Sequence, residues 1–191
     1  MKIIYVNHPK GEKPQIQLTV TRVEPKVWRE LGFYKHHYLS AKLNPSAKCF
    51  LFKWGDIPVG FVAIINQPHK GCRWGYRITR LVVSPSVQGL GISTKILNWC
   101  GALITGSNPD ATLGIMTIHE KLGRYFEKSY LWVPTSPNKR VRKNPEIEGN
   151  RYKNRMIRPS YCYKYAGEPI TGYDELLLPI NSLRDKKTPR Q

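Results

Sequence analysis

Residues 80–97, RLVVSPSVQGLGISTKIL, read as an apolar strand, a glycine-containing turn and the start of a helix. Gly89 and Gly91 let the backbone turn tightly and approach a ligand without a Cβ in the way. The helix that follows begins with unpaired N–H groups at the positive end of its dipole. Together these features suit a pyrophosphate group. The stretch has neither the GK[ST] of a Walker A loop nor the GxGxxG of a Rossmann turn, and a plain strand-to-helix turn is the alternative.

Strands and helices alternate along the rest of the chain. Ile16, Leu18 and Val20 occupy alternate positions, as in a half-buried strand, and apolar residues recur at helical spacing after Gly91. We therefore predict an α/β fold with a mixed central β-sheet flanked by helices, in one domain over residues 1–178 with a flexible tail at 179–191. The predicted strands are 15–23, 49–54, 59–65, 76–83, 112–118, 130–133 and 160–167, the predicted helices are 25–31, 92–104 and 120–129, and 32–47 is predicted to be a loop.

The chain carries a large positive charge, because 31 Lys and Arg residues oppose 13 Asp and Glu residues for a formal net charge of +18. Such an excess creates a field that attracts polyanions. A generally basic surface without such a partner is the alternative. No stretch approaches the roughly 20 apolar residues that span a bilayer, and the first residues lack the apolar core of a signal peptide. We therefore predict a cytoplasmic protein with no membrane partner.

The turn at 88–93 and its flanks resemble the coenzyme A-binding segment of the GNAT N-acetyltransferases. The pattern of that family is Arg or Gln, two residues, Gly, one residue, and Gly or Ala, and Gln88, Gly91 and Ser93 occupy these positions. The resemblance covers residues 15–133 and 160–167. It implies a GNAT fold that binds acetyl-CoA or a related acyl-CoA, with loop amides on the pyrophosphate and strand main chain on the pantetheine arm. The cofactor-binding residues that it implies are Leu81, Val82, Val83, Gln88, Gly89, Leu90, Gly91, Ile92 and Ser93.

The helix predicted at 120–129 departs from the pattern of that family. GNAT enzymes commonly carry Tyr-Glu-Lys here, and the tyrosine is the general acid for the leaving thiolate. In this chain Phe126 stands at that position and Tyr125 lies one place earlier, a rotation of about 100° on a helix. We predict that Tyr125 or Tyr130 takes over the role, or that the reaction is not an ordinary acetyl transfer.

A histidine pair and a tyrosine, His36, His37 and Tyr38, lie within the predicted loop at 32–47. Histidine exchanges protons near neutral pH and is a common metal ligand, although an isolated pair is as readily an ordinary surface feature. The segment WRELGFYKHHYLS at 28–40 resembles the Mom family of phage DNA-modification enzymes, which have the GNAT fold and require a His-Tyr pair. The resemblance implies a product in which N6 of adenine carries a methylcarbamoyl (acetamido) group that protects phage DNA from host restriction.

The methylcarbamoyl group constrains the chemistry. Its new bond joins N6 to the methyl carbon, so simple acyl transfer from CoA does not give it, and a rearrangement, an extra nitrogen donor or a metal-assisted step is needed. Iron is one hypothesis, because the His36–Tyr38 cluster with Asp110 or His119 could form a site of the 2-His-1-carboxylate type. The candidate catalytic residues are His36, His37, Tyr38, Tyr125 and Asp110.

A basic arm is predicted at 134–160, with tyrosines within and after it. Cations contact phosphates, aromatic rings stack on exposed bases, and an enzyme that modifies a base in a duplex must flip it out. A solvated loop with tyrosines paired across a sheet is the alternative. Double-stranded DNA is therefore the predicted partner, and the predicted nucleic-acid-binding residues are Arg77, Lys139, Arg140, Arg142, Lys143, Arg151, Lys153, Arg155 and Arg158.

Three functions remain open at this point. The leading one is a DNA adenine-modifying enzyme of the Mom type that uses an acyl-CoA site. The first rival is an ordinary GNAT acetyltransferase acting on a protein, a tRNA or a small amine. The second rival is a non-catalytic nucleic-acid-binding module on a GNAT fold.

Overall fold

A computed structural model describes residues 2–6, 16–37, 42–69, 71–135, 138–139 and 160–178, with backbone alone for residues 2–6. The strands within this part of the chain are β1 (Lys2–Val6), β2 (Ile16–Val23), β3 (Lys48–Trp54), β4 (Ile57–Asn66), β5 (Gly75–Val83), β6 (Thr112–Thr117), β7 (Trp132–Pro134) and β8 (Tyr161–Tyr165). The helices are α1 (Val27–Glu30), α2 (Ile92–Ser107) and α3 (Glu120–Lys128), with short 3-10 helices η1 (Phe33–His36), η2 (Pro85–Val87) and η3 (Asp174–Leu177).

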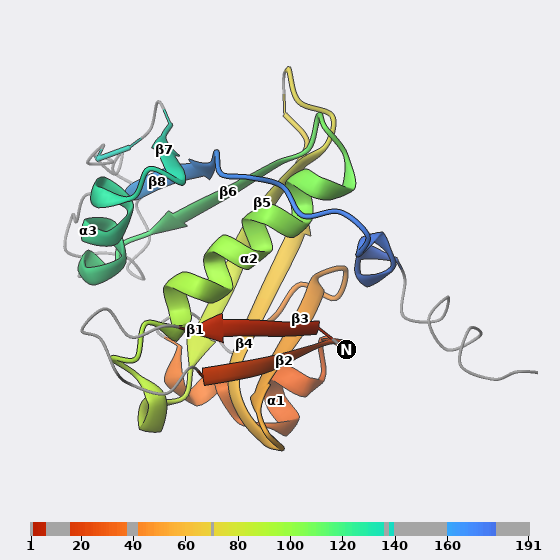
Figure 1. The fold of residues 1–191 in the computed structure, drawn as a ribbon, viewed down its shortest axis with the longest axis vertical. Helices are drawn as coiled ribbons and strands as arrows, with labels where there is room; N and C mark the ends of the chain where they lie inside the picture. The colour runs from red at the N-terminus through yellow and green to blue at the C-terminus, as the bar shows by residue number, and fades with distance from the viewer. Residues whose placement is uncertain are drawn as a thin grey trace, which may run out of the picture.

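These strands form one mixed sheet in the order β1-β2-β3-β4-β5-β6-β8-β7 (Figure 1). Neighbouring strands are antiparallel except β5 and β6, which are parallel. The central strand β4 is buried from Val59 to Ile64, as expected of a strand covered on both faces. The predicted fold class, a mixed sheet flanked by helices, is confirmed.

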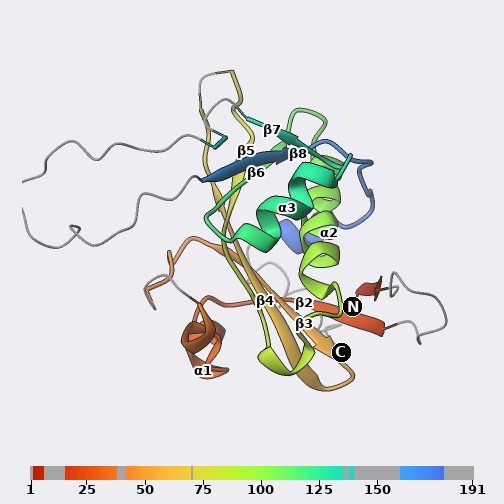
Figure 2. The same ribbon diagram turned by 90° about the vertical axis from the view of Figure 1, so that its left-hand side faces the viewer.

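Helices cover the two faces of the sheet unequally, as Figure 2 shows. The larger core lies under α2, which buries Ile96, Leu97 and Leu103, and it reaches from β2 to β8. The smaller core lies on the opposite face, where Trp28 of α1 and Phe33 of η1 pack on residues of β2 to β5. That smaller core contains no residue of β6, β7 or β8 among those the structure describes.

Strands β5 and β6 separate part-way along their length. They pair from Gly75 and Thr112 to Ile78 and Ile115, and beyond these residues no pairing between them is found in the described chain. The register between β4 and β5 also shifts here, so that Thr79 is an extra, bulged residue. The separation and the bulge open the sheet next to the turn at 88–93.

Several elements differ from the sequence-based prediction. Strand β1 was not predicted, and it pairs with β2 at the sheet edge. The segment predicted as a loop at 32–47 contains η1, because burial of Phe33 fixes one turn of helix against the sheet. Helix α2 extends three residues past the predicted end, to Ser107. Of the predicted basic arm, the structure describes only 134–135, 138–139 and 160, and the predicted tail at 179–191 lies outside the described residues.

In the part of the chain that the structure describes, none of the helices is both long enough and apolar enough to cross a bilayer.

Candidate active site

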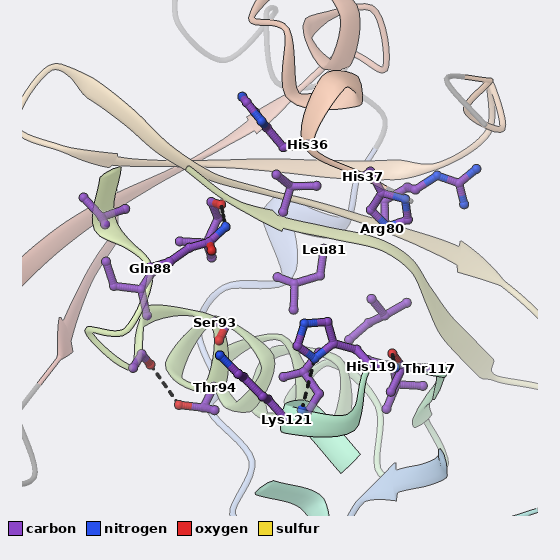
Figure 3. Close-up of a pocket in the computed structure, with 18 of the residues that line it drawn as sticks. His36, His37, Arg80, Leu81, Gln88, Ser93, Thr94, Thr117, His119 and Lys121 are labelled. Atoms are coloured by element: carbon purple, nitrogen blue, oxygen red, sulfur yellow. Dashed lines mark hydrogen bonds between the residues drawn. The ribbon is translucent and has the colours of Figure 1, made fainter. Parts of the chain in front are cut away.

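A cavity of about 450 Å³ lies where β5 and β6 separate. Strand β5 lines it from Ile78 to Val83, and β6 lines it from Ile115 to Thr117. Figure 3 shows His36 and His37 on one side of β5, and Ser93, Lys121 and His119 on the other. The cavity is therefore lined from both faces of the sheet.

The turn at 88–93 forms one wall of the cavity. Gly89 and Gly91 have φ angles of 87° and 77°, in the left-handed region that side chains other than glycine rarely adopt. Gly91 is the N-cap of α2, and no side chain caps the first N–H groups of this helix. Gln88 Nε2 donates a hydrogen bond of 3.1 Å to the carbonyl of Val83, which closes the turn. The uncapped amides of α2 are thus left for an anionic ligand.

The charge of the lining also favours an anion. The described lining residues include two cations, Arg80 and Lys121, and no aspartate or glutamate. Figure 3 shows the Lys121 amino group pointing from the start of α3 toward Ser93 at the start of α2. Lys121 therefore faces the same space as the uncapped helix amides.

The side chain of His37 is held between two elements. Its ring meets the ring of Trp28 edge-on, at 5.7 Å between centroids. Burial, and then the positive charge of Arg80, lower the pKa of His37 to about 4. Arg80 itself donates hydrogen bonds to the carbonyls of Thr79, at 2.8 Å, and Lys42, at 2.9 Å. His37 is therefore a neutral imidazole at physiological pH.

This lowered pKa predicts a specific acid sensitivity of the fold. Between pH 6.5 and 4 the unfolded chain protonates His37 and the folded chain does not, so the free energy of unfolding falls as the pH drops through this range. We expect His37→Phe to remove this part of the pH dependence, because phenylalanine does not titrate. Urea unfolding of both proteins at pH 7.5 and pH 5 measures it. An equal loss of stability in both proteins would contradict the prediction.

His119 is a lining residue whose ring is fixed by its neighbours. It is the N-cap of α3, and its Nδ1 accepts a hydrogen bond of 3.4 Å from the backbone N–H of Leu122. Its own backbone N–H donates to Thr117 Oγ1 at 3.0 Å. When the ring is neutral, its proton therefore lies on Nε2, which is the nitrogen left free to act as a donor.

The structure brings most of the predicted cofactor-binding residues together. Leu81, Val82, Val83, Gln88, Gly89, Gly91, Ile92 and Ser93 line the cavity. Leu90 does not, because its side chain packs against the large core.

Two of the predicted catalytic residues, Tyr125 and Asp110, do not line the cavity as a catalytic role there would require. Tyr125 faces α2 and donates a hydrogen bond of 2.7 Å to Asn98 Oδ1. Asp110 precedes β6, at the end of the strand opposite the cavity, where its carbonyl accepts from Cys72 Sγ. Phe126 is 1% exposed and stacks on Tyr163, so this position belongs to the core.

The predicted nucleic-acid-binding residues are described only in part. Arg77 lies on β5, and Lys139 forms an ion pair of 2.6 Å with Glu127. The other predicted nucleic-acid-binding residues lie outside the described part of the chain, namely Arg140, Arg142, Lys143, Arg151, Lys153, Arg155 and Arg158. The predicted catalytic residue Tyr38 also lies outside it.

No cluster of three or more His, Cys, Asp or Glu side chains able to hold a metal ion occurs within the described ranges. In particular, Asp110 does not meet His36 and His37, because the cavity and Asp110 lie at opposite ends of β6. The described residues therefore give the iron hypothesis no support.

Lys121 was not predicted as a functional residue, and His119 was predicted only as an alternative metal ligand. The sequence held a signal for both, because they follow strand 112–118 and begin the next helix. Ligands of open α/β sheets bind beyond the carboxyl ends of parallel strands, so the segments after β5 and β6 meet there. That these segments meet at the cavity could be predicted only by knowing that β5 and β6 are parallel neighbours.

Comparison with known proteins agrees with the fold described above. Residues 15–102 match the family model described as "Acetyltransferase (GNAT) family". The GNAT-family acetyltransferase of Streptococcus pneumoniae is 15% identical, with a TM-score of 0.52 over 78% of this chain and 99% of that one. The fold is that of the GNAT acetyltransferases.

Other GNAT structures are similar at comparable levels. Naa50 of Arabidopsis thaliana, in complex with a bisubstrate analogue, is 16% identical with a TM-score of 0.50 over 78% of this chain and 99% of that one. Spermidine N-acetyltransferase of Vibrio cholerae, in complex with CoA and spermine, is 9% identical with a TM-score of 0.53 over 77% and 94%. At these identities the structures show a shared GNAT fold. A search of curated proteins gave no match.

Proposed function

We propose that the chain is an acyl-CoA-dependent group transferase of the GNAT type. The proposal rests mainly on the cavity between β5 and β6. This cavity is lined both by the N-terminus of α2, whose first N–H groups no side chain caps, and by three histidines. Its described lining includes no acidic residue. A thioester of CoA would supply an activated two-carbon group at this place. The family match over residues 15–102 supports the same reading.

Residues of the turn and of α3 would hold the cofactor. The N–H groups of residues 89–93 bind the pyrophosphate at the positive end of α2, since the N–H of Gln88 already donates to the carbonyl of Pro85 at 3.3 Å. Lys121 adds a full positive charge from the opposite side of the same space. The main chain of residues 81–83, where β5 has left β6, is available to pair with the amide-containing pantetheine arm.

His37 and His119 would carry protons on the two sides of β5. His37 is neutral and accepts a proton from the acceptor nitrogen once bond formation has made that nitrogen positive and acidic. His119 donates from Nε2 toward the leaving sulfur, a role that Tyr125 cannot serve from its position against Asn98. This assignment replaces Tyr125 as the second proton carrier.

The acceptor we propose is N6 of adenine in DNA, carrying a methylcarbamoyl group after reaction. His36 and His37 belong to the segment that resembles the Mom family, and both line the cavity. The net charge of +18 supports a polyanionic acceptor and disfavours a polycation, because like charges repel at long range. From an acetyl thioester this product balances only if an ammonia-level nitrogen donor displaces CoA as its thiol, and if a two-electron oxidant takes a hydride equivalent from the methyl carbon while N6 loses a proton.

Nucleoside mass spectrometry tests this function. We expect DNA from cells expressing the chain to contain adenine with an added acetamido group, and DNA from cells expressing His37→Phe to lack it. Unmodified DNA beside acetylated protein or tRNA would instead establish an ordinary acetyltransferase. If acetyl-CoA also fails to raise the melting temperature while duplex DNA binds, the chain is a binding module.

A further inference from the structure

We propose that the face of β6 and β8 opposite α2 is the surface on which duplex DNA docks, and that it guides the base to the cavity. This inference rests on the proposed function for the identity of the partner. It deepens that function by assigning a surface, a direction of entry and two phosphate-contacting residues.

Alternation along the strands defines this surface. Tyr76 and Ile78 of β5 pack into the core under α2, so Arg77 between them points to the opposite face. Tyr163 and Tyr165 of β8 also pack into that core, so Lys164 points the same way as Arg77. Both cations therefore lie on the face opposite α2, on the part of that face that the smaller core of α1 and η1 does not reach among the described residues.

The two cations lie in one row across the sheet. Arg77 pairs with Gly114 of β6, and Gly114 pairs with Lys164 of β8. Two strand spacings separate the cations, roughly 10 Å, which equals the rise of about three base pairs along the axis of a duplex. Gly114 between them has no side chain, so the row is low at its centre. We call the surface formed by Arg77, Gly114 and Lys164 the basic row.

The basic row is open within the described chain. The core on this face, built on Trp28 and Phe33, includes no described residue of β6, β7 or β8. Figure 2 shows α1 over the lower part of this face, and no described helix over its upper part. An open sheet face with two cations and a glycine suits a negatively charged backbone better than an apolar partner.

The basic row is continuous with the mouth of the cavity. Met116 is two residues beyond Gly114 on the same face, is 43% exposed, and lines the cavity. His36 and His37 border the cavity from this side of β5, while the turn at 88–93 borders it from the other (Figure 3). A base flipped from a duplex on the basic row therefore enters opposite the cofactor and meets His37 first.

Duplex binding over a range of salt concentrations tests the docking surface. We use the full chain, a mixed-sequence duplex of about 20 base pairs, and the variant Arg77→Gln/Lys164→Gln. Each lost phosphate contact lowers the slope of log K against log salt by about 0.9, so the double variant should lose about 1.8 in slope and bind more weakly throughout. The control Lys53→Gln/Lys128→Gln removes two charges from β3 and α3, and its slope should match the native protein.

The outcomes separate this proposal from the proposed function. Three results would contradict the proposed docking surface. The first is an equal loss of slope in both double variants, and the second is native-like binding by the Arg77/Lys164 variant. The third is tighter binding of an RNA hairpin than of the duplex. If any of these occurs while the native protein still modifies adenine, the proposed function is supported and the docking surface is wrong. If binding depends on Arg77 and Lys164 but DNA carries no acetamido group, the docking surface is supported and the proposed reaction is wrong. Should the double variant unfold, Lys164→Gln alone gives the test, since Lys164 is exposed.

Discussion

Replacing Ser93 with glutamate is expected to abolish acetyl-CoA binding while the fold stays intact. Ser93 is the second residue of α2 and lines the cavity. A carboxylate here is favourable for the helix by about 0.3–1 kcal/mol, because it lies at the positive end of the dipole. It also occupies the place that we propose for the pyrophosphate. Two like charges about 4 Å apart repel by about 4 kcal/mol at an effective dielectric constant of about 20, which corresponds to a loss of affinity of about 1000-fold.

Calorimetric titration with acetyl-CoA measures the loss of binding in Ser93→Glu. The melting temperature without ligand measures whether the fold stays intact. Ser93→Ala is the matched control, and it should bind acetyl-CoA nearly as the native protein does, since the turn binds through main-chain amides. Acetyl-pantetheine, which has no pyrophosphate, should lose much less affinity in Ser93→Glu than acetyl-CoA does. Native affinity for acetyl-CoA in Ser93→Glu would remove the turn at 88–93 from the cofactor site.

Replacing His37 with phenylalanine is expected to lower the transfer rate by about 10²–10⁴, the usual contribution of a general base. Phenylalanine keeps a ring against Trp28, so packing is retained while both ring nitrogens are lost. Because the pKa of His37 is about 4, the native rate should show no decline from this residue between pH 8 and pH 5. A rate that falls with an apparent pKa near 6.5 would assign the essential proton to another histidine.

His69→Phe is the control for this experiment, because His69 is a histidine outside the cavity lining and lies in the connection between β4 and β5. It should leave the transfer rate unchanged. The rate at which acetamido-adenine accumulates in the DNA of cells expressing each variant at equal protein level measures the transfer, because the cell supplies the nitrogen donor and the oxidant. If His37→Phe reacts at the native rate, His37 serves only to pack against Trp28.

The turn at 88–93 could be predicted from local sequence because its determinants are local. Gly89 and Gly91 adopt positive φ angles that their residue type permits, and α2 begins directly after them. The buried positions Ile96, Leu97, Leu103 and Ile104 follow the helical period of the sequence. Even so, the predicted end of α2 at residue 104 fell short of Ser107, although Gly106 and Pro109 mark the true end.

Side-chain direction on α3 could not be predicted in the same way. Tyr125 and Phe126 differ by one position, and which of them faces the cavity depends on how α3 is rotated against the sheet. In the structure neither does, because Tyr125 bonds to Asn98 of α2 and Phe126 fills the core beside Trp132. The N-terminal end of α3, with His119 and Lys121, reaches the cavity instead.

The sequence by itself determined the strand, turn and helix at 80–97, the order of most elements and the positive charge, because these depend on neighbours within a few residues or on composition. Only the tertiary structure decided which groups share the cavity. His37 and His119 are 82 positions apart, and they line one space because β5 and β6 pair in parallel and then separate after Ile78 and Ile115. That separation arises from sheet pairing and helix packing across the whole domain, which no local pattern encodes.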